Sequence, residues 1–196
     1  MRPDKLKQLK ELINKIKAKE IKLTDEEASF IQAKVYEVTT TDGHRFKRER
    51  LFKGNKDGSA VVIVPFINED EVLLCVEPRV FMKNTVGVGF PAGYIEANED
   101  PQDAAARELL EETGCEGKLT HLGGFYQDTG ISGAYNQIYL CEGLKEVGEQ
   151  QLDHDEFISK FTCRFDEVGD LIEDGYIGDA NSVIAYYKVK QLKEGK

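Results

Sequence analysis

The hydrophobic positions of the chain recur with two different periods, and these periods separate expected helices from expected strands. Four apolar residues near the N-terminus recur at helical spacing among lysines: Leu6, Leu9, Ile13 and Ile16. They predict a basic amphipathic helix over residues 5–20. Because the apolar stripe is short, packing against the rest of the molecule or a second subunit is favoured over a role at a membrane surface.

A period of two residues, typical of strands, follows this helix. Residues 24–27 fit a capping box that opens a short helix, and residues 33–38 then alternate between polar and apolar side chains. The pair Asp42 and Gly43 is typical of a tight turn, which leads into a second strand over residues 45–52. An antiparallel hairpin is therefore expected here.

The remaining pattern makes residues 57–196 the main domain, after a small appendage of helix and antiparallel strands over residues 1–56. Two apolar runs rich in β-branched residues, 59–67 and 72–76, predict buried strands. Later strands are expected at 119–126, 137–141 and 157–163, and helices at 101–113, 166–174 and 179–192.

The helix expected over residues 101–113 has clear ends. Asp100 places a carboxylate at the N-cap, Pro101 suits the first helical position, and Gly114 suits a left-handed cap. Four apolar residues at spacings of four are expected to face the sheet: Ala105, Ala106, Leu109 and Leu110.

The other sides of this helix carry three glutamates. Glu108, Glu111 and Glu112 rise from neighbouring points of one surface, where they repel one another, and only Arg107 is available to pair with Glu111. A hard dication with oxygen ligands relieves this repulsion, and Mg²⁺ suits both carboxylates and phosphate oxygens. A pair of glutamates taken alone indicates a solvated acidic face, so the metal site depends on the surrounding pattern.

Composition narrows the partners of such a site. The net charge of -10 argues against a general affinity for nucleic acid, which is bound mainly through clustered lysine and arginine. An acidic protein can bind a phosphorylated small molecule when metal cations mask the repulsion.

The four cysteines lie far apart in the sequence and form no Cys-x-x-Cys pair, so they are expected to be reduced core residues. This expectation favours the cytoplasm. No apolar run has the length expected of a signal peptide or a membrane span.

The residues around the glutamates complete a fixed pattern. Five residues separate Gly93 from Glu99, seven more lead to Arg107, and Gly114 with the apolar Cys115 ends the pattern. It resembles the signature of the Nudix hydrolase family. The resemblance implies an α/β/α sandwich with a mixed β-sheet, and hydrolysis of a substituted diphosphate with Mg²⁺ or Mn²⁺. It also implies that Arg107 and Glu99 pair to brace the loop against the helix.

The family resemblance assigns metal-binding roles within this segment. Glu108 and Glu112 would be the principal metal ligands, and Glu111 would belong to the same cluster. Gly93 would permit a turn that lets the carbonyl of Ala92 reach a metal.

A general base is expected outside the segment. In relatives of the sugar-nucleotide type, a glutamate on a later loop accepts the proton of the attacking water, and residues 153–156 resemble that loop. Glu156 is therefore the expected base and a further metal ligand. Asp153, Asp155 and Glu111 are the alternatives for the base.

Over most of the chain the resemblance is to the ADP-ribose pyrophosphatase-like branch of the family. In that branch an N-terminal antiparallel sheet joins the subunits of a homodimer, and Arg48 with Glu49 resembles a pair that completes the partner's substrate pocket. Ordinary alternation on an exposed strand explains the same two residues. Arg79 resembles an arginine that grips a terminal phosphate or ribose, against the alternative of a loop arginine in water.

The expected reaction is hydrolysis of a nucleoside diphosphosugar, foremost ADP-ribose, to AMP and ribose 5-phosphate. Thr129 stands where ADP-ribose hydrolases commonly have a proline, so GDP-mannose and dinucleoside polyphosphates stay open as substrates. A ligand-binding module without turnover is another interpretation, although three repelling acids argue against it. An isoprenoid diphosphate isomerase ranks last, because Cys75 and Cys115 are expected to be buried.

Overall fold

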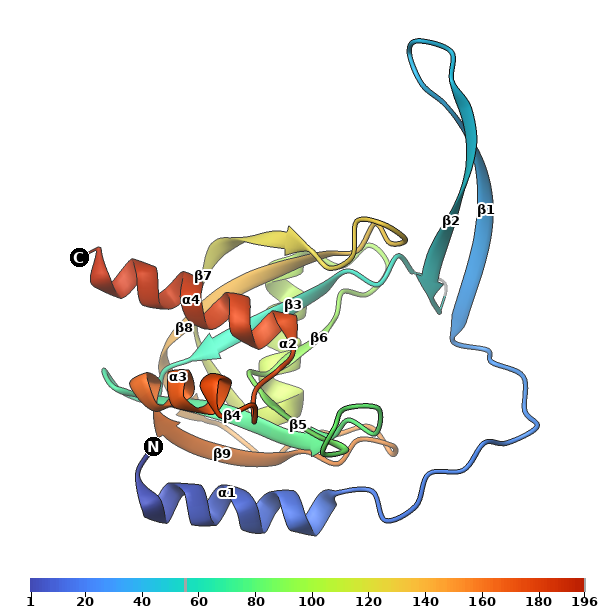
Figure 1. Cartoon of the computed structure of the whole chain (residues 1–196). Helices are drawn as coiled ribbons and strands as arrows, with labels where there is room; N and C mark the ends of the chain where they lie inside the picture. Colours follow the sequence, from blue (N-terminus) through green and yellow to red (C-terminus); the bar gives the residue numbers. More distant parts are fainter. Residues whose placement is uncertain (55, 196) are drawn as a thin grey trace.

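The strands form three sheets in the computed structural model, which describes residues 1–54 and 56–195 (Figure 1). One sheet pairs β1 (Ile31–Thr39) with β2 (Arg45–Lys53). The second has the order β6-β3-β8-β7, which are Ala92–Tyr94, Ala60–Pro65, Tyr135–Glu146 and Cys115–Tyr126. The third has the order β5-β4-β9, which are Val86–Gly89, Glu71–Pro78 and Ser159–Arg164.

Helices cover these sheets, and the strand pairing is mixed. The helices of the described residues are α1 (Pro3–Ile16), α2 (Pro101–Thr113), α3 (Phe165–Glu173) and α4 (Ala180–Glu194). β3 runs parallel to β8 and antiparallel to β6, whereas β4 runs antiparallel to both of its neighbours. This mixed α/β architecture confirms the expected fold class.

β3 lies between two hydrophobic clusters, because its side chains alternate between two faces. Val61 and Ile63 belong to the cluster formed with α2, and Val62 and Val64 belong to the cluster that includes residues of α1, α3 and α4. All four side chains are 0% exposed, as expected for an apolar strand that is covered on both faces.

The two parts of the N-terminal appendage lie in different places. α1 packs against β4 and β9, and its Leu9 is 0% exposed. The β1–β2 hairpin projects away from the body (Figure 1), and it is joined to α1 by residues 17–30, which form no helix or strand. It contacts the body where the N–H of Leu51 donates to the carbonyl of Ile131 at 2.7 Å. The division between residues 56 and 57 stays a prediction.

Two expectations for the N-terminal region are wrong. The helix expected to reach residue 20 ends at Ile16, because Lys17 leaves the helical region with φ -57° and ψ 141°. The short helix expected after residues 24–27 does not form. A capping box satisfies the first N–H groups of a helix, but this exposed segment has no apolar face packed against the body to stabilise one.

The ends of α2 are as expected from the sequence. The side chain of Asp100 accepts a hydrogen bond from the N–H of Gln102 at 2.8 Å, and Gly114 adopts a left-handed φ of 69°. A Cβ at Gly114 would also lie 2.3 Å from the carbonyl oxygen of Gly148. Glycine is therefore required there both by the backbone angle and by the available space.

The buried face of α2 differs in part from the expectation. Ala105 and Leu109 are buried as expected, but Leu110 is only partly buried, Ala106 is exposed, and Ala104 is buried in its place. The helix is thus rotated relative to the predicted face, and this rotation turns Glu112 inward. A buried carboxylate is the consequence that matters for the site.

Hydrophobic periodicity does not predict the short strands β5 and β6. Each has at most four residues and includes glycine, which is too little for a period to show. All four cysteines are buried and free, as expected. No helix among the described residues is long and apolar enough to cross a membrane.

Candidate active site

α2 places two of its glutamates, Glu108 and Glu112, against strand β6. Glu112 is 5% exposed, and the side chain of Glu108 is 12% exposed, whereas that of Glu111 is 37% exposed. Glu112 accepts a hydrogen bond from the N–H of Ala92 in β6 at 3.1 Å. Two of the three carboxylates therefore lie in a largely desolvated position between α2 and β6.

Arg107 binds the outer side of this cluster. Its guanidinium donates to both carboxylate oxygens of Glu99, at 2.8 and 2.9 Å, and to Glu108 and Glu111 at 2.7 and 2.9 Å. It also donates to the carbonyl of Tyr94 at 3.0 Å. The expected pair of Arg107 with Glu99 is thus present. Its hydrogen bonds lower the pKa of Glu99 and raise that of Arg107.

Gly93 is needed for a close approach and not for a turn. It lies in the extended strand β6 and does not have a positive φ, so the turn expected at this position is wrong. A Cβ at Gly93 would lie 2.0 Å from the carboxyl carbon of Glu108 and within 2.2 Å of both its oxygens. The absence of a side chain on Gly93 therefore lets Glu108 lie directly against β6.

Burial raises the pKa of three carboxyl groups: Glu77, Glu108 and Glu112. After burial, the charges of Glu77 and Glu108 add to the rise at Glu112, and the charge of Glu156 raises all three. Since desolvation and neighbouring negative charge both disfavour ionised carboxyls, a cation beside them would be strongly stabilising.

A divalent cation fits this donor set. Glu112 accepts hydrogen bonds from the N–H of Ala92 and the thiol of Cys75, so no basic side chain of the described chain neutralises it. In residues 1–54 and 56–195, no three His, Cys, Asp or Glu side chains already converge as metal ligands. Arg107 instead bridges Glu108 and Glu111. The metal-binding roles of these glutamates therefore stay predictions, supported by the buried carboxylate of Glu112, which has no basic partner among the described residues, and by the neighbouring oxygens of Glu108 and Glu111.

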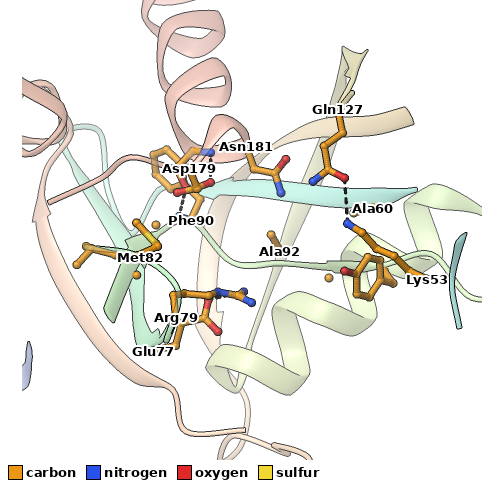
Figure 2. Close-up of a pocket in the computed structure, with 16 residues that line it drawn as sticks. Lys53, Ala60, Glu77, Arg79, Met82, Phe90, Ala92, Gln127, Asp179 and Asn181 are labelled. Carbon is orange, nitrogen blue, oxygen red and sulfur yellow. Dashed lines mark hydrogen bonds and ion pairs between the residues drawn. The ribbon is translucent and has the colours of Figure 1, made fainter. Parts of the chain in front are cut away.

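A cavity of about 310 Å³ adjoins the glutamates, with Ala92 and Gly93 in its wall (Figure 2). Its polar lining comes from distant segments: Lys53, Glu77, Arg79, Gln127, Asp179 and Asn181. Ligand pockets commonly measure about 300–1,000 Å³, so this cavity suits one part of a nucleotide-sized molecule.

Of the predicted substrate-binding residues, Arg79 lies in this cavity. Its guanidinium pairs with Glu77 at 2.7 Å (Figure 2). Arg48 and Glu49 lie on the projecting hairpin and do not line this cavity of their own chain. Arg48 instead stacks on Phe46, with 4.5 Å from its guanidinium carbon to the ring centroid. A role for Arg48 and Glu49 in substrate binding would therefore require a second chain.

Glu156 lies on the exposed loop before β9. Its carboxylate accepts a hydrogen bond from the N–H of Asp153 at 3.1 Å, and its charge raises the pKa of Glu108 and Glu112. The fold therefore brings Glu156 within electrostatic reach of the cluster. Its role as the base stays a prediction.

Sequence reasoning missed several polar residues of the site: Lys53, Gln127, Asp179 and Asn181. They belong to no short motif and come from separate parts of the chain. Their common signal is position, because each stands near the end of a strand or the start of a helix. Such ends meet at sheet edges, but the sequence alone does not say which of them meet.

Similarity to known proteins agrees with this geometry. The NUDIX domain model matches residues 56–186. ADP-ribose pyrophosphatase of Bacillus subtilis (strain 168) is 32% identical over 162 residues, which cover 82% of this chain and 84% of that protein. The methanol dehydrogenase activator of Bacillus methanolicus is 31% identical over 167 residues, which cover 84% and 86%.

A solved structure shares the fold as well. The crystal structure of an ADP compounds hydrolase superposes with a TM-score of 0.73 and 25% identity, covering 88% of this chain and 91% of that chain. The matched domain includes α2, with its glutamates, and most of the cavity wall. This chain is therefore a member of the Nudix hydrolase family.

Proposed function

We propose that the protein hydrolyses the diphosphate linkage of ADP-ribose to AMP and ribose 5-phosphate, with Mg²⁺ as its metal. The observation that carries the proposal is a pair of largely desolvated carboxylates, Glu108 and Glu112, packed against Ala92 and Gly93, which line a cavity of about 310 Å³. ADP-ribose as the substrate is supported by similarity to proteins named ADP-ribose pyrophosphatase from B. subtilis and Saccharomyces cerevisiae.

Oxygen donors would hold the metal at the edge of α2. They are the carboxylates of Glu108, Glu111, Glu112 and Glu156, with the carbonyl of Ala92. When bound, divalent cations supply the positive charge that offsets the diphosphate oxygens. Mg²⁺ is proposed because every donor is a hard oxygen atom, and Mn²⁺ shares this preference.

Arg79 binds a phosphate oxygen of the substrate. Its side chain is 55% exposed and is held by one ion pair with Glu77, so it can turn toward the cavity at little cost. A guanidinium can donate two parallel hydrogen bonds to a phosphate. Arg79→Lys keeps the charge but loses this fork and should raise KM.

Glu156 accepts the proton of the attacking water. The water oxygen forms a bond to phosphorus, the bridging P–O bond breaks, and the proton passes to the carboxylate of Glu156. The exposed position of Glu156 on its loop leaves the carboxylate free to meet water. Separate Gln or Asn variants of Glu156, Asp153, Asp155 and Glu111 identify the base, because only its loss should remove the acidic limb of the kcat–pH profile.

The active form is proposed to be a cytoplasmic homodimer, with no nucleic acid or membrane as partner. Apolar side chains stand exposed on the β1–β2 hairpin: Ile31, Val35, Tyr36 and Phe46. Arg48 and Glu49 share this hairpin and would complete the cavity of the partner. The buried, free cysteines suit a reducing compartment. Sedimentation analysis of the purified chain tests the dimer.

A substrate panel tests the activity directly. Purified protein with Mg²⁺ is incubated with ADP-ribose, GDP-mannose and a dinucleoside polyphosphate, and the phosphomonoesters are identified by chromatography. We expect ADP-ribose to give AMP and ribose 5-phosphate with the largest kcat/KM. Preference for another member of the panel would reassign the substrate, and no product from any of them would overturn the proposal.

A second candidate function is activation of a dehydrogenase. Its support is the similarity to the methanol dehydrogenase activator of B. methanolicus over most of both chains. The projecting hairpin would be available to a partner enzyme. The two functions are separated by assaying ADP-ribose hydrolysis by the isolated chain, which the first requires and the second does not.

A further inference from the structure

Polar side chains on one side of the cavity have no part in the chemistry described above. Asp179 and Asn181 stand at the start of α4, and Gln127 directly follows β7. All three line the cavity. Figure 2 shows Asn181 and Gln127 on one side of the cavity and Arg79 on the other.

The amide of Asn181 is oriented from behind by a buried residue. Asn136 on β8 is 0% exposed, and its Nδ2 donates to Oδ1 of Asn181 at 2.6 Å. This hydrogen bond turns the oxygen of Asn181 toward Asn136 and leaves its Nδ2 free to donate into the cavity. Oδ1 of Asn136 has no hydrogen-bond partner among the described residues, so this buried amide is retained at a cost in stability. Asn136 is therefore a positioning residue.

The amide of Gln127 is also oriented by a neighbour, which likewise leaves its NH₂ group free to donate. Nζ of Lys53 donates to Oε1 of Gln127 at 3.0 Å (Figure 2). Because an ammonium group can only donate, the oxygen of Gln127 must face Lys53 and its Nε2 is left free. Asn181 and Gln127 thus both offer amide N–H donors at this side of the cavity.

Asp179 adds an acceptor beside these donors. Its Oδ1 caps α4 by accepting the N–H of Ser182 at 2.8 Å. Within the described part of the chain, Oδ2 of Asp179 accepts no hydrogen bond. The wall made of Asp179, Asn181 and Gln127, called the amide wall below, therefore combines free N–H donors with one carboxylate oxygen.

We propose that the amide wall binds the hydroxyl groups of the sugar that is joined to the second phosphate of the substrate. A hydroxyl both donates and accepts, so it can accept from Asn181 or Gln127 and donate to Asp179. A phosphate only accepts and would be repelled by the carboxylate of Asp179. This inference rests on the proposed function and names the part of the substrate that the wall selects.

The other surfaces near the cavity suit the other parts of the substrate. Arg79 lies across the cavity and suits the diphosphate. Tyr94 lines the cavity and Phe30 lies beside it, with ring centroids 6.1 Å apart, and these partly exposed rings suit a nucleobase. The amide wall, with Lys53 beside Gln127, is a further polar surface of the cavity, and its combination of N–H donors and a carboxylate acceptor matches a sugar.

Binding without turnover tests the amide wall. Calorimetry with Mg²⁺ measures Kd for α,β-methylene ADP-ribose, and for α,β-methylene ADP, which lacks the second sugar. Asn181→Leu removes one hydrogen bond to the sugar, so we expect Kd for the sugar analogue to rise roughly five- to tenfold. Kd for α,β-methylene ADP should stay within about twofold. Gln191→Ala, on the exposed face of the same helix, is the matched control and should change neither.

Two further variants keep the test decisive if Asn181→Leu fails to fold. Gln127→Leu should cause a similar selective loss for the sugar analogue. Asn136→Asp is nearly isosteric but replaces the donor behind Asn181 with an acceptor, which should turn the amide of Asn181 around. The same selective loss is expected, although Asn136 does not itself line the cavity.

Equal losses for both analogues, or no loss for either, would overturn the inference. Because binding is measured without hydrolysis, the result is independent of the substrate panel. A selective loss in a protein that fails to hydrolyse ADP-ribose would refute the proposed function and leave the sugar site in place. Normal hydrolysis without a selective loss would refute the sugar site alone.

Discussion

The carboxylate cluster, formed by Glu108, Glu111 and Glu112 of α2, and the amide wall belong to one site but are built in opposite ways. The cluster comes from one continuous segment, in which Arg107 ties Glu99, Glu108 and Glu111 together. The wall comes from two distant segments, the start of α4 and the end of β7, that meet only in the folded chain. The residues of a continuous segment can keep their positions relative to one another when other parts of the fold change, whereas residues from separate segments cannot. We therefore infer that the cluster determines the reaction and the wall determines the substrate.

The largest effect should follow a change within the cluster. Glu108→Gln removes a largely desolvated charge but keeps an oxygen that can accept a hydrogen bond from Arg107, so the fold should survive. We expect kcat to fall by about two to three orders of magnitude, since a metal ligand acts on the transition state. Steady-state kinetics and a thermal melt measure both properties. Glu173→Gln, an exposed glutamate of α3, is the control; near-normal activity of Glu108→Gln would contradict the metal assignment.

Gly93→Ala tests the close approach between β6 and α2. The new Cβ would occupy the position of the Glu108 carboxylate, so this side chain must move. A displacement of about 1 Å can lower the rate on the order of 100-fold, and we expect a loss of that size in kcat. Gly148→Ala adds a methyl group with no atom within 4 Å and should leave the rate unchanged. Equal activity of the two variants would show that Glu108 need not lie against β6.

Arg107→Met tests how far the cluster depends on its own arginine. The change leaves three carboxylates without their guanidinium partner. Arg107 is 30% exposed, so solvent screens part of the loss, and we expect about 2 kcal/mol off the free energy of unfolding in urea without metal. Arg164→Met breaks an exposed pair with Asp166 and should cost less than about 0.5 kcal/mol. Similar values for the two variants would mean that the pairs of Arg107 contribute little.

The contrast between cluster and wall also explains what could be predicted from the sequence. Asp100, Gly114 and the Arg107–Glu99 pair depend on neighbours in one segment. The local sequence predicts the two caps, and the resemblance of the segment to the family signature implies the pair. Lys53, Gln127 and Asn181 become neighbours only when separate elements pack, so no local pattern marks them. The prediction of the buried face of α2 was wrong in part for the same reason. The rotation of the helix that exposes Ala106 is set by contacts with the sheet.

The pH dependence of stability should be the smallest effect. Burial raises the pKa of Glu112 well above its ordinary value of 4.5. At a pH between 4.5 and this raised pKa, the folded protein therefore binds more protons than the unfolded chain. Its free energy of unfolding must therefore fall as pH rises through this window. In EDTA we expect Tm to fall by on the order of a few degrees, and Glu112→Gln should remove this contribution. A contribution from Glu112 that rises with pH would contradict the assignment.

Glu167 provides the opposite dependence as an internal contrast. Burial alone would raise its pKa, but hydrogen bonds from Arg2 and the N–H of Arg164 outweigh burial and lower the pKa to about 2. Its contribution to stability is present above pH 4.5 and is lost as pH falls toward 2. Glu167→Gln should therefore weaken the acid sensitivity of unfolding, and an unchanged profile would show that the pair with Arg2 is not formed.

The claim that the cluster determines the reaction and the wall determines the substrate is tested most directly with two variants, Glu108→Gln and Asn181→Leu. Each is assayed with Mg²⁺ on two substrates, ADP-ribose and GDP-mannose. The measured quantity is the ratio of the two kcat/KM values. We expect Glu108→Gln to lower both values by the same large factor and leave the ratio unchanged, whereas Asn181→Leu should shift the ratio with little change in kcat. A ratio altered by Glu108→Gln, or an equal loss on both substrates in Asn181→Leu, would contradict the account.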